Sequence, residues 1–234
     1  MSGRQQNFDA TCWTLIQGAA AGARADREVF ARRYVSVVRA YLAHRWRGSP
    51  LASEVEDAVQ EVFLECFREG GVLDRIRADR PASFRAFLYG VARNVAFRCE
   101  RRVGRQSERH AGGSLEADEV AADEATMSRV FDRAWAQALM RQAATLQEER
   151  ARDAGEEAVR RVEILRLRAS EGLPVREIAR LWSLDAAYVH KQYARARQEF
   201  RDALVDALQY HHPGATAAEI DDRCREMLAL SQGS

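Results

Sequence analysis

An acidic stripe occurs at residues 54–67, in the segment EVEDAVQEVFLECF. Its acids, Glu54, Asp57, Glu61 and Glu65, follow one another at steps of three and four residues, so on a helix they share one face. A negative helix face suits an arginine-rich protein surface and steers association with it. The alternative for this segment taken alone is an ordinary solvated helix face.

A cationic strip with one amide lies further along, at residues 83–102 (SFRAFLYGVARNVAFRCERR). The arginines are Arg93, Arg98, Arg101, Arg102 and, just beyond, Arg105, and the amide is Asn94. Such arginines suit the phosphates of a nucleic-acid strand, while asparagine and aromatic side chains suit an unstacked base. Phe84, Phe87 and Tyr89 can also be core residues, and we expect two of these three to be.

A helix, a turn and a second helix are predicted for residues 173–201. The first helix, from about Pro174 to Trp182, should bury Ile178, Ala179 and Leu181. After a turn at Ser183-Leu184, Asp185 is placed to cap the second helix. That helix should bury Val189, Tyr193 and Ala196, and leave Tyr188, Lys191, Gln192 and Arg195 on another face. This geometry places a second helix in the major groove of DNA, although two core helices joined by a turn are the alternative.

No other chemistry is indicated by the residue types and their spacing. Nothing resembles a nucleophile–base pair, a phosphate-binding glycine-rich loop or a metal motif, so we expect no enzyme activity, no cofactor and no metal. The four cysteines are far apart, and His211, His212 and Cys224 are better explained as a solvated turn and a buried thiol than as a metal cluster. The longest uncharged run has 14 residues (10–23), too few for a membrane span, and no signal peptide is visible. We therefore expect a cytoplasmic protein without membrane insertion.

The net charge of +1 is an average over blocks of different sign. Residues 1–105 carry +6, residues 106–155 carry −4, residues 156–210 carry +1 and the remainder carries −2. A basic block followed by an acidic stretch indicates two modules and a connector, and Gly112-Gly113-Ser114 marks the connector.

The elements that position these groups are all predicted to be helices. Apolar residues recur at steps of three and four over residues 30–42, 55–67, 84–95, 130–146 and 162–167, and no two-residue alternation indicates a strand. The predicted helix starts are a capping box at Ser53-x-x-Glu56, an N-cap at Ser83 and a second capping box at Thr216-x-x-Glu219. This last box precedes a short amphipathic helix, which should pack on the second domain or bind a regulator. The fold class is therefore all-α.

These segments resemble the bacterial RNA polymerase sigma factors, and more narrowly the extracytoplasmic-function (ECF) group of the sigma-70 family. Residues 172–197 are similar to its C-terminal promoter-reading region, with matches at Gly172, Leu173, Glu177, Ile178, Ala179, Arg195, Ala196 and Arg197. Residues 54–67 resemble its polymerase-binding helix. Residues 83–102 resemble its helix that reads the −10 promoter element, with matches at Phe84, Leu88, Ala92 and Asn94, and with Phe87 where tryptophan is usual.

The resemblance implies two small helical domains joined by a flexible linker. Sigma region 2 would span residues 8–105, the linker 106–124, the region 4 helix-turn-helix 125–208, and a C-terminal extension with a short helix 209–234. Glu54, Asp57, Gln60, Glu61 and Glu65 would bind the β′ clamp helices of core polymerase. Asn94, Arg93, Arg98, Arg101 and Arg102 would contact the −10 element, and Arg168, Tyr188, His190, Lys191, Gln192 and Arg195 the −35 element of promoter DNA. An anti-sigma factor, the tail extension or phosphorylation would regulate the protein.

Several positions depart from the family pattern. Ser183 replaces the usual turn glycine, Ala194 stands at a −35 contact position but cannot donate a hydrogen bond, and Gly90 replaces a commonly basic residue. These departures leave the −35 sequence open more than DNA binding itself. The alternative functions are a stand-alone helix-turn-helix regulator that does not engage polymerase, and a protein-interaction module.

Overall fold

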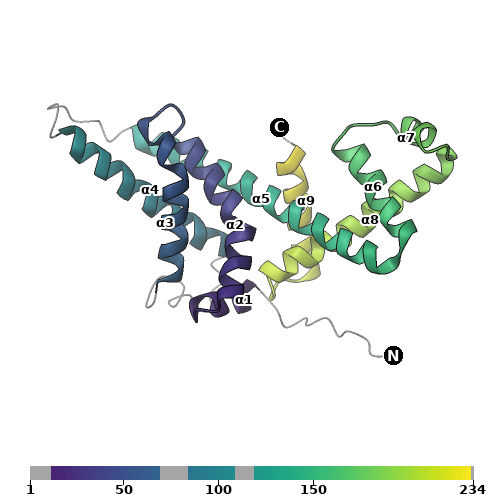
Figure 1. Cartoon of the computed structure of the whole chain (residues 1–234), viewed down its shortest axis with the longest axis horizontal. Helices are drawn as coiled ribbons and strands as arrows, with labels where there is room; N and C mark the ends of the chain where they lie inside the picture. Colours follow the sequence, from purple (N-terminus) through teal and green to yellow (C-terminus); the bar gives the residue numbers. More distant parts are fainter. Residues whose placement is uncertain (1–11, 69–83, 109–118, 233–234) are drawn as a thin grey trace. The chain divides into compact units, whose positions relative to one another are not determined.

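The structure, a computed structural model, describes residues 12–68, 84–108 and 119–232, and all regular elements in these ranges are helical (Figure 1). They are α1 (Cys12–Ala20), α2 (Arg24–Arg45), the 3-10 turn η1 (Pro50–Glu54), α3 (Val55–Phe67), α4 (Phe84–Glu108), α5 (Glu119–Ala154), α6 (Glu156–Ala169), α7 (Val175–Leu181), α8 (Ala186–His211) and α9 (Ala217–Gln232). The all-α prediction is confirmed.

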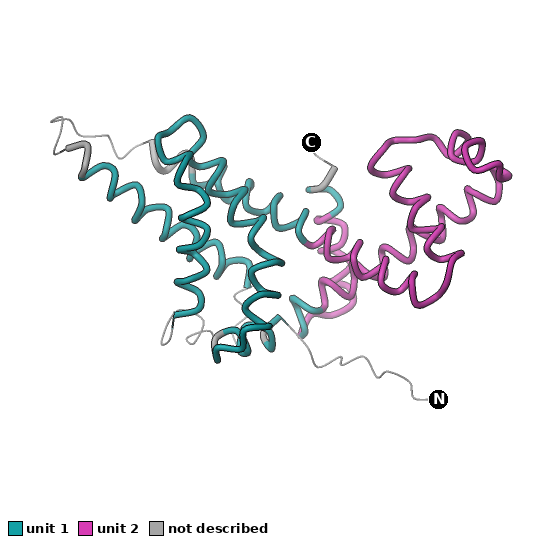
Figure 2. Tube along the Cα trace, viewed as in Figure 1, with its two compact units in different colours: residues 1–138, 210–213, 228–234 teal, residues 139–209, 214–227 magenta. Residues whose placement is uncertain are grey.

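Two compact units divide the chain (Figure 2). Unit 1 holds residues 1–138, 210–213 and 228–234, and unit 2 holds residues 139–209 and 214–227. The first border between them falls within α5, whereas the sequence places the second domain's start at residue 125. Helix also extends into both ends of the predicted linker, since α4 ends at Glu108 and α5 begins at Glu119.

An aromatic cluster forms the centre of unit 1. The Phe30 ring lies 5.0 Å from Tyr34, 6.0 Å from Phe63, 5.3 Å from Phe67 and 5.6 Å from Phe84, so it joins α2, α3 and α4. These contacts arise because α2, α3 and α4 each place apolar residues at helical spacing on one face. The aromatic rings of α2, α3 and α4 therefore form one shared core around Phe30.

The first half of α5 completes this core. Its apolar face buries Met127, Phe131 and Trp135. Trp135 stacks on Tyr34 with ring centroids 5.5 Å apart and planes 4° apart, and the His211 ring lies 5.2 Å from Trp135. Unit 1 is thus closed by residues distant in sequence from α2, α3 and α4.

Unit 2 is built around a small apolar cluster shared by α6, α7 and α8. Its buried members are Ile164, Leu167, Val175, Ile178, Ala179 and Val189. Gly155 separates α5 from α6 with a backbone φ of 102°, which favours glycine because other residues are strained there. The buried face of α9, made of Ile220, Cys224 and Met227, fits the predicted packing, and an ion pair of 2.9 Å joins Arg201 of α8 to Asp221.

The predicted helix starts have different outcomes. The capping box at Thr216 is confirmed, because Glu219 accepts a hydrogen bond from the Thr216 backbone N–H (2.7 Å). Asp185 caps α8 as predicted, since its Oδ2 accepts from the Tyr188 N–H (2.9 Å). The Ser53 box is wrong: Ser53 lies in η1 and donates to the Pro50 carbonyl (3.1 Å), and Arg39 holds Glu56 instead. Ser83 lies outside the described residues.

Two core assignments near α7 also differ from the sequence prediction. Leu181 was expected to be buried but is 67% exposed, and Trp182 packs against the unit 2 cluster in its place. Tyr193 is half-buried at the edge of the same cluster. The short α7 ends at Leu181, so the first residue after it, and not the last within it, turns toward the core.

Candidate nucleic-acid and protein interfaces

The acidic face of α3 consists of Glu54, Asp57, Gln60, Glu61 and Glu65. The first three side chains are exposed, because the opposite face of α3 buries Val55, Ala58, Val59, Val62 and Cys66 in unit 1. Glu61 and Glu65 are half-buried, and Arg98 of α4 donates to both, at 3.0 and 3.3 Å. The structure therefore leaves one end of the stripe open for a partner and fixes the other end to α4.

An exposed leucine lies on the same face. Leu64 is 70% exposed, and its spacing from Asp57 and Gln60 is seven and four residues, which places it on their side of the helix. The sequence reasoning missed this residue, although the run Phe63-Leu64 breaks the apolar spacing of the buried stripe. An exposed apolar side chain among acids is more typical of a protein-binding surface than of a helix face that contacts only solvent.

The cationic stripe of α4 is defined here as Asn94, Arg98, Arg101 and Arg105. Its members are exposed and follow one another at steps of four, three and four residues, so they lie along one face. Arg102 is exposed beside this stripe, with a guanidinium nitrogen 3.8 Å from the Cys99 sulfur. Arg98 is shared with Glu61 and Glu65, while Asn94 can contact one base and Arg101 and Arg105 can contact phosphates.

Arg93 does not share this face. Its Nε donates to the Glu124 carboxylate of α5 (2.9 Å), and its guanidinium lies over the Phe97 ring at 5.0 Å. The sequence grouped Arg93 with the other arginines because it is next to Asn94, but neighbouring residues point about 100° apart on a helix. Arg93 thus holds α4 against α5 within unit 1.

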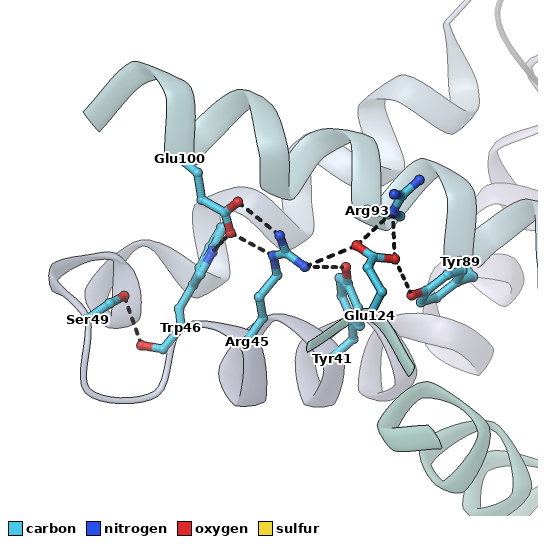
Figure 3. A network of polar contacts seen from close by, with 8 residues as sticks. All are labelled: Tyr41, Arg45, Trp46, Ser49, Tyr89, Arg93, Glu100 and Glu124. Carbon is cyan, nitrogen blue, oxygen red and sulfur yellow. Dashed lines mark hydrogen bonds and ion pairs between the residues drawn. The ribbon is translucent and has the colours of Figure 1, made fainter. Parts of the chain in front are cut away.

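A polar network on the inner side of α4 contains this contact (Figure 3). The Arg45 side chain is only 6% exposed and donates to Glu100 at 2.6 and 3.0 Å. Trp46 also donates to Glu100, from Nε1 (2.8 Å), and Tyr89 donates to Glu124 (3.3 Å). The network joins α2, α4 and α5 on the inner side of α4, and so fixes which face of that helix is exposed.

The charges in this network stabilise one another. Burial alone would lower the pKa of the Arg45 guanidinium, but the hydrogen bonds to Glu100, with Tyr41 nearby, outweigh burial and raise that pKa above its ordinary value. Burial raises the pKa of the Tyr41 hydroxyl to about 12. Arg45 and Tyr41 therefore each keep one protonation state over the physiological range.

The exposed surface of α8 carries His190, Lys191 and Arg195. Ala194 lies with them, as expected, and Arg168 is exposed on α6 with a hydrogen bond to the Gly172 carbonyl (3.4 Å). Tyr188 is half-buried, because its ring packs against the unit 2 cluster. The structure brings the three exposed cationic or imidazole groups together on one helix.

Gln192 corrects the sequence prediction. Its side chain is 6% exposed, and its Nε2 donates to Glu157 of α6 (3.2 Å). The helix turns this position toward α6, since Gln192 follows the buried Val189 by three residues. Gln192 therefore supports the packing of α8 on α6 and does not lie on the exposed face.

Arg195 is only loosely held by its acidic neighbour. Its side chain is 64% exposed and lies 3.4 Å from Glu199. The Glu199 carboxylate is already bound by Arg161, which is 7% exposed and 2.8 Å away. An exposed pair of this kind contributes little stability, so the Arg195 guanidinium is available to another acceptor.

Metal and membrane sites are not found in the described part of the chain. No group of three or more His, Cys, Asp or Glu side chains there could hold a metal ion. Within the same residues, no helix combines the length and the apolar character that crossing a bilayer requires.

Part of the chain matches a known protein family. Residues 30–106 match the family Sigma-70 region 2, and this range contains α3, the stripe of α4 and most of α2. No curated protein sequence matches the chain. Residues 30–106 therefore form a sigma-70 region 2 domain, and this domain holds both the acidic face of α3 and the cationic stripe of α4.

Proposed function

We propose that the chain is a sigma factor of the ECF group, which binds core RNA polymerase and directs initiation at particular promoters. The observation that carries the proposal is the sigma-70 region 2 domain at residues 30–106. Its support beyond that domain is the resemblance of residues 172–197 to the family's second promoter-reading region.

Core polymerase is bound by the acidic face of α3 in this proposal. Glu54, Asp57 and Gln60 are exposed and contact the β′ clamp helices, while Glu61 and Glu65 are shared with Arg98. Binding through exposed carboxylates gives fast, salt-dependent association, because the charges act at long range.

Promoter DNA is read by the two units separately. In unit 1, Asn94 contacts an unstacked −10 base while Arg98, Arg101 and Arg102 follow the phosphates. In unit 2, α8 enters the major groove at the −35 element and presents His190, Lys191 and Arg195. The chain performs no covalent chemistry, and its regulator is an anti-sigma factor, its own tail extension or phosphorylation.

Gel filtration with core polymerase tests the polymerase contact. We expect the wild-type chain to co-elute with core, and Asp57→Arg to abolish co-elution because it reverses an exposed charge. Glu28→Arg is the control, since Glu28 is an exposed acid on α2 that pairs with Arg24 and does not belong to the acidic face of α3. A wild-type chain that binds DNA but never co-elutes would favour the stand-alone regulator.

Run-off transcription tests the −10 assignment. Asn94→Ala should reduce the rate of open-complex formation by about tenfold, because one base contact is worth about 1–3 kcal/mol. Its side chain is exposed, so its removal should leave the unfolding free energy unchanged within about 0.5 kcal/mol. Unchanged transcription would remove Asn94 from the reading surface.

A further inference from the structure

A groove outside the surfaces described above runs between α2 and α5 in unit 1. Its volume is about 840 Å³, and it is lined by four of the residues between 40 and 47 and by six of those between 126 and 137. Its floor is small and apolar, made of Ala40, Ala43, Val130 and Ala134. These four side chains offer no hydrogen bond, so the charged contacts that the groove can make come from the arginines among its lining residues.

Three exposed arginines form that rim: Arg47, Arg129 and Arg133. No acidic side chain lines the groove. Arg47 has only the His44 ring beside it (3.4 Å), and Arg129 donates only to the Thr126 hydroxyl (3.3 Å), as far as the described residues show. The rim therefore carries positive charge that the described part of the chain does not neutralise.

Other arginines and other grooves of the described residues do have acidic neighbours. Arg45, two residues before Arg47, is held between Glu100 and Glu124, at 2.6 and 3.8 Å. Two grooves of unit 2 contain both signs: one has Arg152 and Arg160 beside Glu156 and Glu163, and the other has Arg150 and Arg161 beside Glu199 and Asp202. The α2–α5 groove differs because its cations lack carboxylate neighbours.

We propose that the α2–α5 groove binds the phosphate backbone of promoter duplex DNA through Arg47, Arg129 and Arg133. Arg129 and Arg133 are four residues apart on α5, about 6 Å along its axis, so they can contact two phosphates of one strand. A guanidinium group binds phosphate oxygens in a bidentate way, and the shallow floor admits a backbone without base contacts. The inference rests on the proposed function for its ligand and adds a contact that carries no sequence information.

The test compares two variants that each lose two positive charges. Arg129→Ala/Arg133→Ala removes both rim arginines of α5 and keeps the helix, because alanine has the highest helix propensity. Arg24→Ala/Arg32→Ala is the control on exposed positions of α2 away from the groove. Arg129→Lys/Arg133→Lys retains the charge, and circular dichroism checks that all variants are folded.

Fluorescence anisotropy of the full chain with a labelled random duplex, between about 50 and 200 mM salt, gives the measurement. We expect Arg129→Ala/Arg133→Ala to weaken binding at every salt concentration, equally for duplexes of different sequence, and to reduce the slope of log Kd against log salt by about 2. The control variant should change this slope by much less than 2. The lysine variant should keep a slope close to that of the wild type, because it retains both positive charges.

Four results would overturn the proposal. They are equal losses in the alanine variant and the control, no loss in either, no duplex binding by the wild type at about 50 mM salt, and a loss of core polymerase binding with duplex binding retained. The last result would assign the groove to an acidic protein. Failure of the sigma proposal would give a different result. In that case the wild-type chain would not co-elute with core polymerase, while Arg129→Ala/Arg133→Ala would still reduce the salt slope of duplex binding.

Discussion

Ser183 shows how a single residue bears on the geometry between α7 and α8. Its backbone φ is 53°, in the left-handed region, where the family pattern usually has glycine. A side chain with a Cβ atom costs about 1–2 kcal/mol there, because Cβ approaches the following carbonyl oxygen. With serine in place of glycine at position 183, the turn between α7 and α8 is retained, but its backbone is strained.

We predict that Ser183→Gly raises the free energy of unfolding by about 0.5–1 kcal/mol. Relief of the left-handed strain exceeds the entropy that glycine adds to the unfolded chain. Urea unfolding followed by circular dichroism measures the change. Ser170→Gly is the control, because Ser170 has a φ of −94° and no such strain, so there the same substitution should lower stability. Equal effects in the two variants would contradict the explanation.

His211 makes the stability of unit 1 depend on pH. Burial, helped by His212 and Arg33, lowers the pKa of its imidazole to about 3. In the unfolded chain that pKa is about 6.5, so below this pH the unfolded state takes up a proton that the folded state does not. The contribution to stability is complete above pH 6.5 and is lost as the pH falls toward 3.

We predict that the wild type loses up to about 1.4 kcal/mol of unfolding free energy per pH unit more than His211→Gln below about pH 6. Urea titrations at pH 7, 6 and 5 measure both slopes. The variant has no ionising group at this position, so the difference isolates His211 from the carboxylates. Parallel slopes for the two proteins would show that His211 is protonated in the folded state.

At the scale of the element, α8 separates binding from packing. Arg195 and Gln192 are three residues apart, but one side chain is 64% exposed and the other residue is 6% exposed. We predict that Gln192→Ala lowers the unfolding free energy by about 1 kcal/mol, because it removes a part-buried hydrogen bond to Glu157. Arg195→Ala should leave stability within about 0.5 kcal/mol and weaken binding to a −35 duplex about tenfold. Urea unfolding and anisotropy measure the two quantities, and the opposite pattern would reverse the assignments.

The helices themselves could be predicted because their apolar spacing is strong. The stripe over residues 30–42 and the Asp185 cap depend on local sequence, and both agree with the structure. The position of α3's start was not predictable from the Ser53 pattern, because Arg39, distant in sequence, binds Glu56 at 2.6 and 2.8 Å. Tertiary ion pairs of this kind compete with local caps and leave no signal in the segment itself.

The interfaces were predictable in residue type but not in orientation. Asn94, Arg98 and Arg101 share a face as their spacing requires. Arg93 and Gln192 were misplaced, because their partners Glu124 and Glu157 come from other helices. The α2–α5 groove was missed for a related reason. Arg47 is 82 positions before Arg129 in the sequence, so nothing local indicates that the two lie in the same groove.

At the scale of the whole molecule, unit 1 extends well beyond the sigma-70 region 2 match. Trp135 lies outside residues 30–106 but stacks on Tyr34 within the core of that domain. We predict that Trp135→Ala lowers the unfolding free energy of unit 1 by about 3–5 kcal/mol, as expected for a large buried aromatic side chain. Gln137→Ala, on the exposed side of the same helix, should change it by less than about 0.5 kcal/mol. Near-ultraviolet circular dichroism during urea unfolding measures both, and a small effect of Trp135→Ala would show that region 2 is stable without α5.

The exposed Lys191 of α8 has a practical consequence, because it is the chain's single lysine. Apart from a terminal amine, an amine-reactive fluorophore has one target among these 234 residues. The dye would be attached four residues before Arg195, on the surface proposed to enter the major groove. The natural sequence thus offers a site-specific optical reporter of promoter engagement, with no introduced cysteine and with the four buried thiols left untouched.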